Sequence, residues 1–442
     1  MLKRFSIILF FVISVPGAFA QEKHAWTLEE CIYYAEEHSL QIQKQNLNIE
    51  ENEIAVDEGK WAFVPSLSIS SNYTMSTGRV LDPTTYQFVE TSYTGNSSSS
   101  LSSDITIFEG GRKSLALQKA KLSLKGVEVQ KLSSQFELES NVISSFMDIL
   151  CCKEQINIAK ETYALVDSQL AHSKDMLDAG SITESDVLQL QSQLFSAKND
   201  ISSAKHSFDL ARIGLCDLLE IDGYEDFEIS YPDDITSNIR LIDIDGAIER
   251  HPGYQSSLIA NGLAEADLKL AKSTLSPRLS LSAGYGSSFS DARKKAIQNE
   301  DGTLKYAAYP FFEQYVDNAS AYASVGLSIP ILSGLSARNG IKRAEIAAKE
   351  AEIATLDVKK QLRKEILQAQ TDCTAAEEQY LQAVEEARYA EEALRQITEK
   401  YNYGTTDYLS WNTAMVELAK SKYLLAEKKY TYILKTEILK MY

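Results

Sequence analysis

The chain has 442 residues, with 44 lysines and arginines against 62 aspartates and glutamates, and its formal net charge is −18 at pH 7. This acidic balance disfavours nucleic-acid partners, because nucleic-acid phosphates require a basic protein surface. The five cysteines are an odd number, and their spacing fits neither a disulfide framework nor a metal site. We therefore interpret them as small buried apolar residues.

Residues 1–20 have the features of a cleaved secretion signal. Lys3 and Arg4 precede an apolar run, and a small-x-small cleavage site follows at residues 18–20. The run is shorter than the ~20 residues that a membrane-spanning helix requires, and no later apolar run reaches that length. The sequence therefore predicts export and no transmembrane helix.

The exported part is predicted to begin with a helix from Thr27 to Trp61. Glu30 lies three residues after Thr27, which is the spacing of a capping box. After Pro65 the hydrophobic period changes from 3.6 to 2, which indicates strands. We expect strands at about 65–73, 99–108, 277–285 and 322–331, with polar loops at 74–98 and 287–318 between the members of each pair.

Each expected strand has one apolar face and one face of small polar residues. In the first, Leu67 and Ile69 alternate with serines. Strands of about 9 to 11 residues cross a bilayer when tilted, and aromatic residues such as Trp61 and Tyr285 flank them as at membrane interfaces. The alternative is two soluble hairpins that pack one face on a core, although these apolar faces are too narrow to cover a sandwich.

Four strands are too few to close a barrel within one chain, because single-chain barrels begin at about eight strands. An open sheet edge cannot lie in lipid. If the strands span a membrane, several copies must therefore share one barrel, and three copies would supply twelve strands.

Two proline-free runs, 111–178 and 335–402, predict helices of about 68 residues each, or roughly 100 Å. Isolated helices of this length need coiled-coil packing. Shorter helices return after Gly180 and Gly404, the first from Thr183 to Leu219.

The order of strands, long helix, turn and shorter helix occurs twice, at a constant offset that relates Gly110 to Gly334 and Gly180 to Gly404. A repeat this long is not a solenoid unit, so it indicates duplication of a whole module. The expected division is a signal peptide at 1–20, a first repeat at 21–220, an equatorial linker between the repeats at 221–243 and a second repeat at 244–442.

No catalytic constellation, phosphate-binding loop or metal cluster is evident, so a secreted enzyme is the weakest class, and we expect no cofactor. His38 and His251 occupy related positions in the two repeats. That symmetry favours a structural role at helix-to-helix contacts over metal binding.

The turns after the two long helices carry a stronger signal. Gly180 and Gly404 supply the left-handed residue that ends one helix, and Thr, Ser and Asp residues then cap the next. Asp186 follows Gly180 by six residues and begins an Asp-Val-Leu sequence.

This arrangement closely resembles the TolC family of outer-membrane efflux factors, over the whole exported chain. In that family a Gly-led turn followed six residues later by Asp-Val-Leu forms the periplasmic tip of a coiled-coil hairpin, and Gly180 to Asp186 keeps this spacing. The resemblance implies a mainly helical homotrimer that shares one twelve-stranded barrel in outer-membrane lipid and continues into a twelve-helix periplasmic tunnel.

Members of the family are exit ducts without chemistry of their own. The resemblance implies docking on a periplasmic adaptor, which joins an inner-membrane pump of RND or ABC type in a tripartite efflux or type I secretion system. The implied location is the outer membrane of a Gram-negative bacterium. The implied adaptor-contacting residues at the tips are Gly180, Ser181, Thr183, Gly404, Thr405 and Thr406.

By the same resemblance, Asp186 matches a carboxylate at the closed aperture, with Glu184 nearby. The second tip departs from the pattern, because Ser410 stands at the position equivalent to Asp186. Either Asp407 and Glu184 supply the charge instead, or the aperture is less acidic. The alternative is that Asp186 is merely a first-turn helix residue. A further class is a soluble periplasmic scaffold or adaptor, but adaptors carry one helical hairpin with flanking β domains, whereas this chain has two hairpins.

Overall fold

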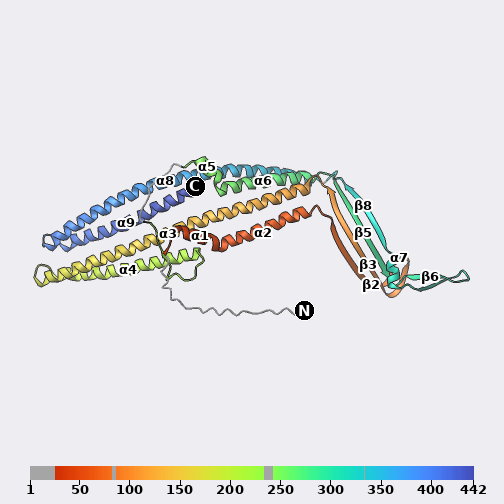
Figure 1. The fold of residues 1–442 in the computed structure, drawn as a ribbon, viewed down its shortest axis with the longest axis horizontal. Coiled ribbons are helices and arrows are strands. Elements are labelled where there is room, and N and C mark those ends of the chain that lie inside the picture. The colour runs from red at the N-terminus through yellow and green to blue at the C-terminus, as the bar shows by residue number, and fades with distance from the viewer. Residues whose placement is uncertain (1–24, 82–85, 233–241, 333) are drawn as a thin grey trace, which may run out of the picture. The chain divides into compact units, whose positions relative to one another are not determined.

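The structure is a computed structural model that describes residues 25–81, 86–232, 242–332 and 334–442 (Figure 1). The expected signal peptide and much of the expected linker, residues 233–241, lie outside the described residues. The chain divides into two compact units, which are described separately. The prediction of a mostly helical chain with a smaller sheet is confirmed.

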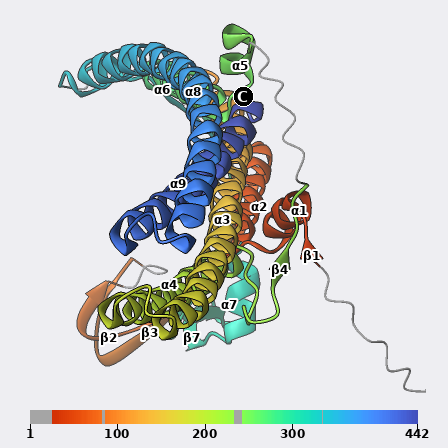
Figure 2. The same cartoon turned by 90° about the vertical axis from the view of Figure 1, so that its left-hand side faces the viewer.

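The first unit comprises residues 1–42, 135–241 and 367–442. Its elements are β1 (Ala25–Trp26), α1 (Leu28–His38), α4 (Glu184–Leu218), β4 (Glu228–Ile229), α9 (Tyr408–Lys440) and the later parts of α3 (Arg112–Asp178) and α8 (Ser336–Asn402). Figure 2 views the helical hairpins from their turns, with α4 beside α3 and α9 beside α8. The long helices α3 and α8 have 67 residues each. Within the described residues, no helix has the length and apolarity needed to cross a membrane.

The helix expected from Thr27 to Trp61 is interrupted, so that prediction is wrong at its centre. The capping box starts α1 as expected, since Glu30 Oε2 accepts the Thr27 N–H at 2.9 Å. Ser39 then adopts ψ 125°, which ends α1, and α2 (Leu40–Trp61) begins at the next residue. His38 stacks on Tyr34 with ring centroids 3.8 Å apart, at this helix junction.

The second unit comprises residues 43–134 and 242–366. Besides most of α2 and the earlier parts of α3 and α8, its elements are β2 (Ser66–Leu81), β3 (Phe88–Phe108), α5 (Ile244–Arg250), α6 (Pro252–Ser273), β5 (Arg278–Ser290), β6 (Lys294–Gln298), β7 (Leu304–Ala308), α7 (Phe311–Asp317) and β8 (Ser320–Ser328). Within the described residues, β2, β3, β5 and β8 form an antiparallel sheet in that order (Figure 1).

Strand register places the predicted apolar side chains on one face of this sheet. Ile69 lies opposite Leu101, which lies opposite Tyr285, and Leu281 lies opposite Val325. These five side chains are exposed in the described chain. Directly opposite residues share a face in an antiparallel pair, so the apolar rows run across all the strands.

The other face carries serine and glycine. Ser68 lies opposite Ser102, with hydroxyl oxygens 2.9 Å apart, and Ser102 lies opposite Gly284. Ser70 and Ser100 repeat this pairing at 2.9 Å. The alternation read from the sequence is therefore confirmed as two chemically different faces.

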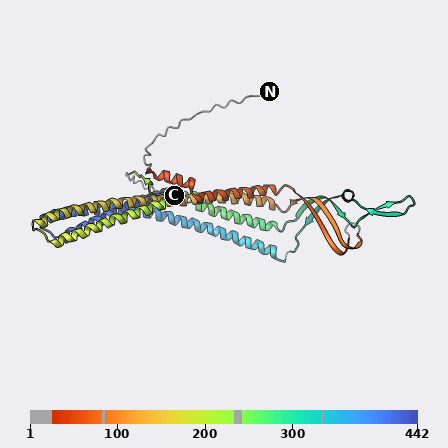
Figure 3. The ribbon, with the colours of Figure 1, turned by 90° about the horizontal axis from the view of Figure 1, so that it is seen from below.

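The expected loops are wrong in their extent. Residues 74–81 and 88–98 continue β2 and β3 with paired backbones, because each segment finds a partner strand that local polarity does not reveal. The region 287–318 contains the end of β5, the β6–β7 hairpin that projects beyond the sheet (teal in Figure 3), and α7. Serine and threonine side chains are compatible with the hydrogen-bonded ladder of a sheet, so a polar composition alone does not distinguish a loop from a strand.

Two strand details also differ from the sequence pattern. Simple alternation would place Ile107 on the same face as Ile105, but a register shift between Thr106 and Phe108 makes Ile107 the extra residue of a bulge. Strand β8 ends at Ser328 rather than near 331, and Pro330 follows with no N–H to donate.

Helices α2 and α6 pack closely on the earlier part of α3. A Cβ on Gly262 would lie 3.0 Å from Leu122 Cδ2, and one on Gly59 would lie 3.1 Å from Leu117 Cδ1, so glycine allows this approach. His251 lies at the junction of α5 and α6, where its Nδ1 accepts the Gly253 N–H at 3.1 Å. His38 and His251 thus both lie at the junction of two consecutive helices, which agrees with the structural role expected for them.

The core of the first unit contains three of the cysteines. Cys31, Cys216 and Cys373 are buried, whereas Cys151 and Cys152 are half-buried, so the prediction of burial is wrong for that adjacent pair. Burial raises the pKa of the Cys31 thiol to about 12 and that of Cys151 to about 11. Burial therefore disfavours the reactive thiolate form at both positions.

Candidate functional site

The first turn (residues 179–183) ends α3 with a Schellman motif. Gly180 has φ +72°, its N–H donates to Leu177 O at 2.8 Å, and the Ser181 N–H donates to Met176 O at 2.9 Å. Among the described residues, no heavy atom lies within 4 Å of where a Gly180 Cβ would stand. Glycine is therefore required here by backbone conformation and not by crowding.

Helix α4 then begins with a capping box. Thr183 Oγ1 accepts the Asp186 N–H at 3.3 Å, and Asp186 Oδ2 accepts the Thr183 N–H at 3.0 Å and its hydroxyl at 2.8 Å. The Asp186 carboxylate therefore holds the start of its own helix in the single chain. Glu184, in the same first turn, is exposed.

The second turn (residues 403–407) repeats the backbone geometry. Gly404 has φ +68° and donates its N–H to Tyr401 O at 2.9 Å, and the Thr405 N–H donates to Lys400 O at 2.9 Å. Asp407 caps α9, where its carboxylate accepts the Ser410 N–H at 2.9 Å.

The two turns use the same two groups in exchanged positions. In the first, a hydroxyl residue (Thr183) is the N-cap and the carboxylate of Asp186 is three residues later. In the second, the carboxylate of Asp407 is the N-cap and Ser410 is three residues later. Both carboxylates accept hydrogen bonds from backbone N–H groups at the N-terminal end of a helix, and they thereby satisfy donors that have no partner within the helix.

The two hairpins pack together next to their turns. Trp411 of α9 is fully buried, and its indole N–H donates to Thr398 Oγ1 of α8 at 3.0 Å. Gln169 of α3 donates to Asn402 Oδ1 of α8 at 3.3 Å. The buried cluster at this end consists of Val166, Leu170, Val187, Leu190, Leu394, Tyr401, Tyr408, Trp411 and Met415.

This cluster brings Asp186 close to the second hairpin. Burial raises the pKa of the Tyr401 hydroxyl, and the negative charge of Asp186 raises it further. The same two causes, with the Tyr401 charge, raise the pKa of Tyr408. The structure therefore groups Asp186 with two buried tyrosines that sequence reasoning did not select. The aromatic residues around the second turn, including Trp411, are the feature of the sequence that could have indicated this cluster.

Replacing Gly180 with alanine is expected to destabilise the first turn by about 1–2 kcal/mol, because alanine resists positive φ. The matched control is Gly214→Ala in the interior of α4, where the described residues leave open space for a Cβ. That control is expected to stabilise the helix by about 0.5–1 kcal/mol. Urea titration followed by helical circular dichroism measures both. Equal effects would contradict the assigned backbone role of Gly180.

The cap at Asp407 is expected to weaken in acid. Hydrogen bonds from Ser410, side chain first and then backbone, lower the pKa of the Asp407 carboxyl. A group with a depressed folded pKa contributes stability above its unfolded pKa of about 3.9, and this contribution disappears as pH falls through the folded pKa. The Tm advantage of the native chain over Asp407→Asn should therefore shrink below about pH 4. An advantage independent of pH would contradict the cap.

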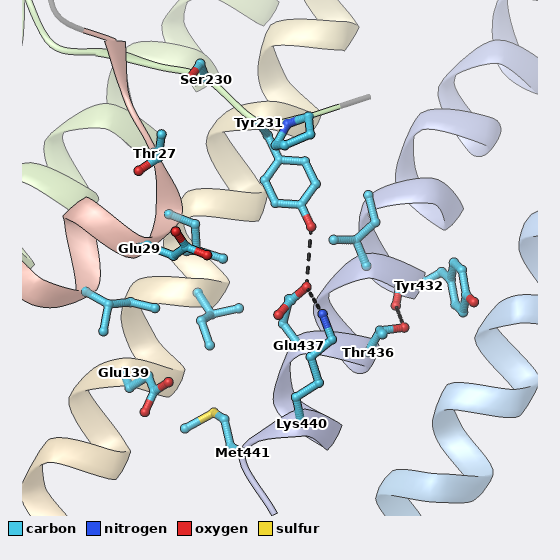
Figure 4. A pocket seen from close by; sticks show the side chains of 15 residues that line it. Thr27, Glu29, Glu139, Ser230, Tyr231, Tyr432, Thr436, Glu437, Lys440 and Met441 are labelled. Atoms are coloured by element: carbon cyan, nitrogen blue, oxygen red, sulfur yellow. Dashed lines mark hydrogen bonds and ion pairs between the residues drawn. The ribbon is translucent and has the colours of Figure 1, made fainter. Parts of the chain in front are cut away.

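A separate cavity of about 640 Å³ lies in the first unit among α1, α3, α9 and residues 230–232 (Figure 4). Glu437 lies at its centre and accepts hydrogen bonds from the Tyr231 hydroxyl at 3.4 Å and from Lys440 Nζ at 2.7 Å. Burial and the Glu437 charge raise the pKa of Tyr231 to about 12. Burial raises the pKa of the Glu139 carboxyl, and the negative charge of Glu36 raises it further. No sequence motif marks this cavity.

Among the described residues, no group of three His, Cys, Asp or Glu side chains is placed to hold a metal ion. The features with a defined geometry are thus the two capped turns, the cluster that joins them and the exposed apolar sheet face. Together they define a class of protein, one with two long helical hairpins and an antiparallel sheet whose apolar face is exposed.

The sequence matches the outer membrane efflux protein family over residues 31–219 and 244–438. The chain therefore belongs to the outer membrane efflux protein family, and the resemblance seen in the sequence is confirmed. The expected role in outer-membrane efflux is confirmed at this level. Among curated proteins, none matches the chain.

Several solved structures share the fold. CusC is 17% identical with a TM-score of 0.78, over 93% of this chain and 90% of its own. VceC of Vibrio cholerae is 15% identical with a TM-score of 0.78, over 94% of this chain and 95% of its own. The CmeC outer membrane channel of Campylobacter jejuni is 16% identical with a TM-score of 0.77, over 99% of this chain and 93% of its own. At identities this low, the structural likeness shows a shared fold and nothing more specific.

Proposed function

We propose that three copies of this chain form an outer-membrane exit duct. The duct receives substrate from an inner-membrane pump of RND or ABC type through a periplasmic adaptor and releases it outside, in a tripartite efflux or type I secretion system. The chain reaches the outer membrane of a Gram-negative bacterium after export by a cleaved signal at residues 1–20. The pump, not the duct, selects the substrate.

The observation that carries this proposal is the chemistry of the four-stranded sheet. Its apolar face is exposed, its opposite face carries serines and glycines, and β2 and β8 are the edges of the sheet within the described residues. An edge with unpaired backbone groups cannot lie in lipid. Pairing β8 of one copy with β2 of the next satisfies both edges, and three copies close a barrel of twelve strands, above the minimum of about eight.

The number and length of the helices are consistent with a helical tunnel that continues from such a barrel. The pairs α3–α4 and α8–α9, each preceded along the chain by paired strands, are proposed as the two pseudo-repeats, with residues 221–243 as the equatorial linker. Three copies of two hairpins supply twelve helices. The hairpin ends are proposed as the adaptor contacts, through Gly180, Ser181 and Thr183 at the first turn and Gly404, Thr405 and Thr406 at the second.

The test is negative-stain imaging of the full chain after detergent extraction. A hollow particle with threefold symmetry is the expected result. A compact or monomeric particle that stays soluble without detergent would contradict the proposal and favour a soluble periplasmic scaffold or adaptor.

We further propose that Asp186 lines the closed aperture, with Glu184, Asp407 and Ser410 nearby. Carboxylates repeated around a threefold axis attract cations. Replacing Asp186 with asparagine retains an oxygen that can accept the Thr183 N–H but removes the charge, so block of channel conductance by divalent cations should weaken in planar bilayers. Asp200→Asn, further along the same helix, is the control and should leave the block unchanged. An unaltered block in the Asp186 variant would restrict Asp186 to helix capping.

A further inference from the structure

Helix α7 (Phe311–Asp317) lies on the apolar face of the four-stranded sheet. The Tyr315 hydroxyl hydrogen-bonds with Ser97 Oγ at 2.8 Å and Ser99 Oγ at 3.2 Å, both on β3. Alternation along β3 places these serines on the same face as Leu101. This small helix therefore covers part of the surface on which the apolar rows stand.

Strand β5 also contacts the side of α7 that faces the sheet. Ser287 Oγ donates to Tyr315 O at 2.6 Å, and the rings of Phe289 and Phe311 have centroids 4.9 Å apart. Gln314 is fully buried, and its amide hydrogen-bonds with both backbone groups of Ser290, at 3.1 Å to the N–H and 2.9 Å to the carbonyl. The attachment is therefore specific, and it involves the two central strands of the sheet.

The opposite side of α7 is apolar and uncovered in the described chain. Phe312 is 80% exposed and Val316 is 74% exposed, and their spacing of four residues places them on one helix face. An ion pair between Lys295 Nζ and Glu313 Oε2, at 2.6 Å, lies beside them. With Asp317, these residues line a shallow groove of about 360 Å³ that combines two apolar and three charged side chains.

The position of α7 along the strands matches the boundary of a lipid-facing band. On this face β5 carries Leu279, Leu281, Ala283, Tyr285, Ser287 and Phe289, over about 33 Å of extended chain, or roughly 23 Å in height when the strand is tilted by about 45°. Phe289, Phe311 and Tyr315 gather at the loop end of this band, where outer-membrane proteins place aromatic girdles.

We propose that α7 is an interfacial anchor whose Phe312 and Val316 side chains insert into the lipid leaflet at the loop end of the sheet. This inference rests on the proposed function, since it requires the apolar sheet face to meet lipid. Lipid is the occupant because α7 stands on that face, at its aromatic end, and leaves the apolar side chains of Phe312 and Val316 exposed. A second copy of the chain would add its strands at the edges β2 and β8, whereas α7 is attached to β3 and β5.

The experiment uses the full chain reconstituted in phosphatidylcholine vesicles, with or without bromine on the acyl chains. Bromine quenches only tryptophans that reach the acyl region. Phe312→Trp and Val316→Trp each add one indole, and the unsubstituted chain provides the background from Trp26, Trp61 and Trp411. We expect the added emission to be shifted to shorter wavelength and largely lost in brominated vesicles.

Leu281→Trp, on the apolar face of β5, separates failure of this inference from failure of the proposed function. Quenching at 281 without quenching at 312 and 316 would overturn the anchor while leaving the lipid-facing sheet intact. No quenching at any of the three positions would overturn both. Emission at 312 that is shifted to shorter wavelength but unquenched would also overturn the anchor, because it would place protein over α7.

Discussion

Replacing Trp411 with alanine is expected to lower the free energy of unfolding near the two turns by about 3–5 kcal/mol. The indole is fully buried in the cluster that joins the hairpins, and its N–H is hydrogen-bonded to Thr398. The substitution therefore leaves a large cavity and also removes the donor for a half-buried hydroxyl. No other single truncation in this cluster removes as much buried volume.

The readout for Trp411→Ala is the rate of tryptic cleavage after Lys400, in the last turn of α8, under conditions where native chains are cut slowly. Cleavage of the open form tracks local stability, so the rate should rise steeply. Leu409→Ala is the matched control, because Leu409 is 68% exposed on the same helix and its loss should cost less than about 0.5 kcal/mol. Similar cleavage rates in the two variants would show that the cluster does not hold the hairpins together.

Replacing Leu281 with arginine is expected to destabilise the membrane-inserted protein by about 2–4 kcal/mol, if its face meets lipid near the bilayer centre. The neighbouring Ser282→Arg is the control, because Ser282 lies on the serine and glycine face, opposite Asp104. An arginine there would lie in the water-filled interior of the proposed barrel, close to a carboxylate. Its cost should be near zero.

Urea titration in phosphatidylcholine vesicles, followed by the gel mobility of folded and unfolded chains, measures this pair of variants. The difference between them is the informative quantity, since both substitutions place the same charge on the same strand. A soluble sheet that packs its apolar face on protein would also reject Leu281→Arg, but it would unfold alike with and without vesicles. Equal costs for the two variants would contradict the assignment of the faces.

The sequence determined features that depend on near neighbours. Alternation around Leu281 predicted which side chains share a sheet face, because successive strand residues point to opposite sides whatever the partner strand is. Gly180 and Gly404 marked the helix ends because positive φ is a local requirement. The spacing of Thr27 and Glu30 located a helix start because a capping box joins residues only three positions apart. The repeated order of these local signals was sufficient to indicate the family.

The tertiary structure decided what depends on contacts distant in sequence. The segments 74–81 and 88–98 are strands because each meets a partner, and no local pattern required it. Trp411 is central because two hairpins pack around it. The placement of α7 on the apolar face depends on hydrogen bonds between Tyr315 and serines more than two hundred residues away. Side-chain period and backbone conformation are local properties, whereas pairing and burial belong to the assembled chain.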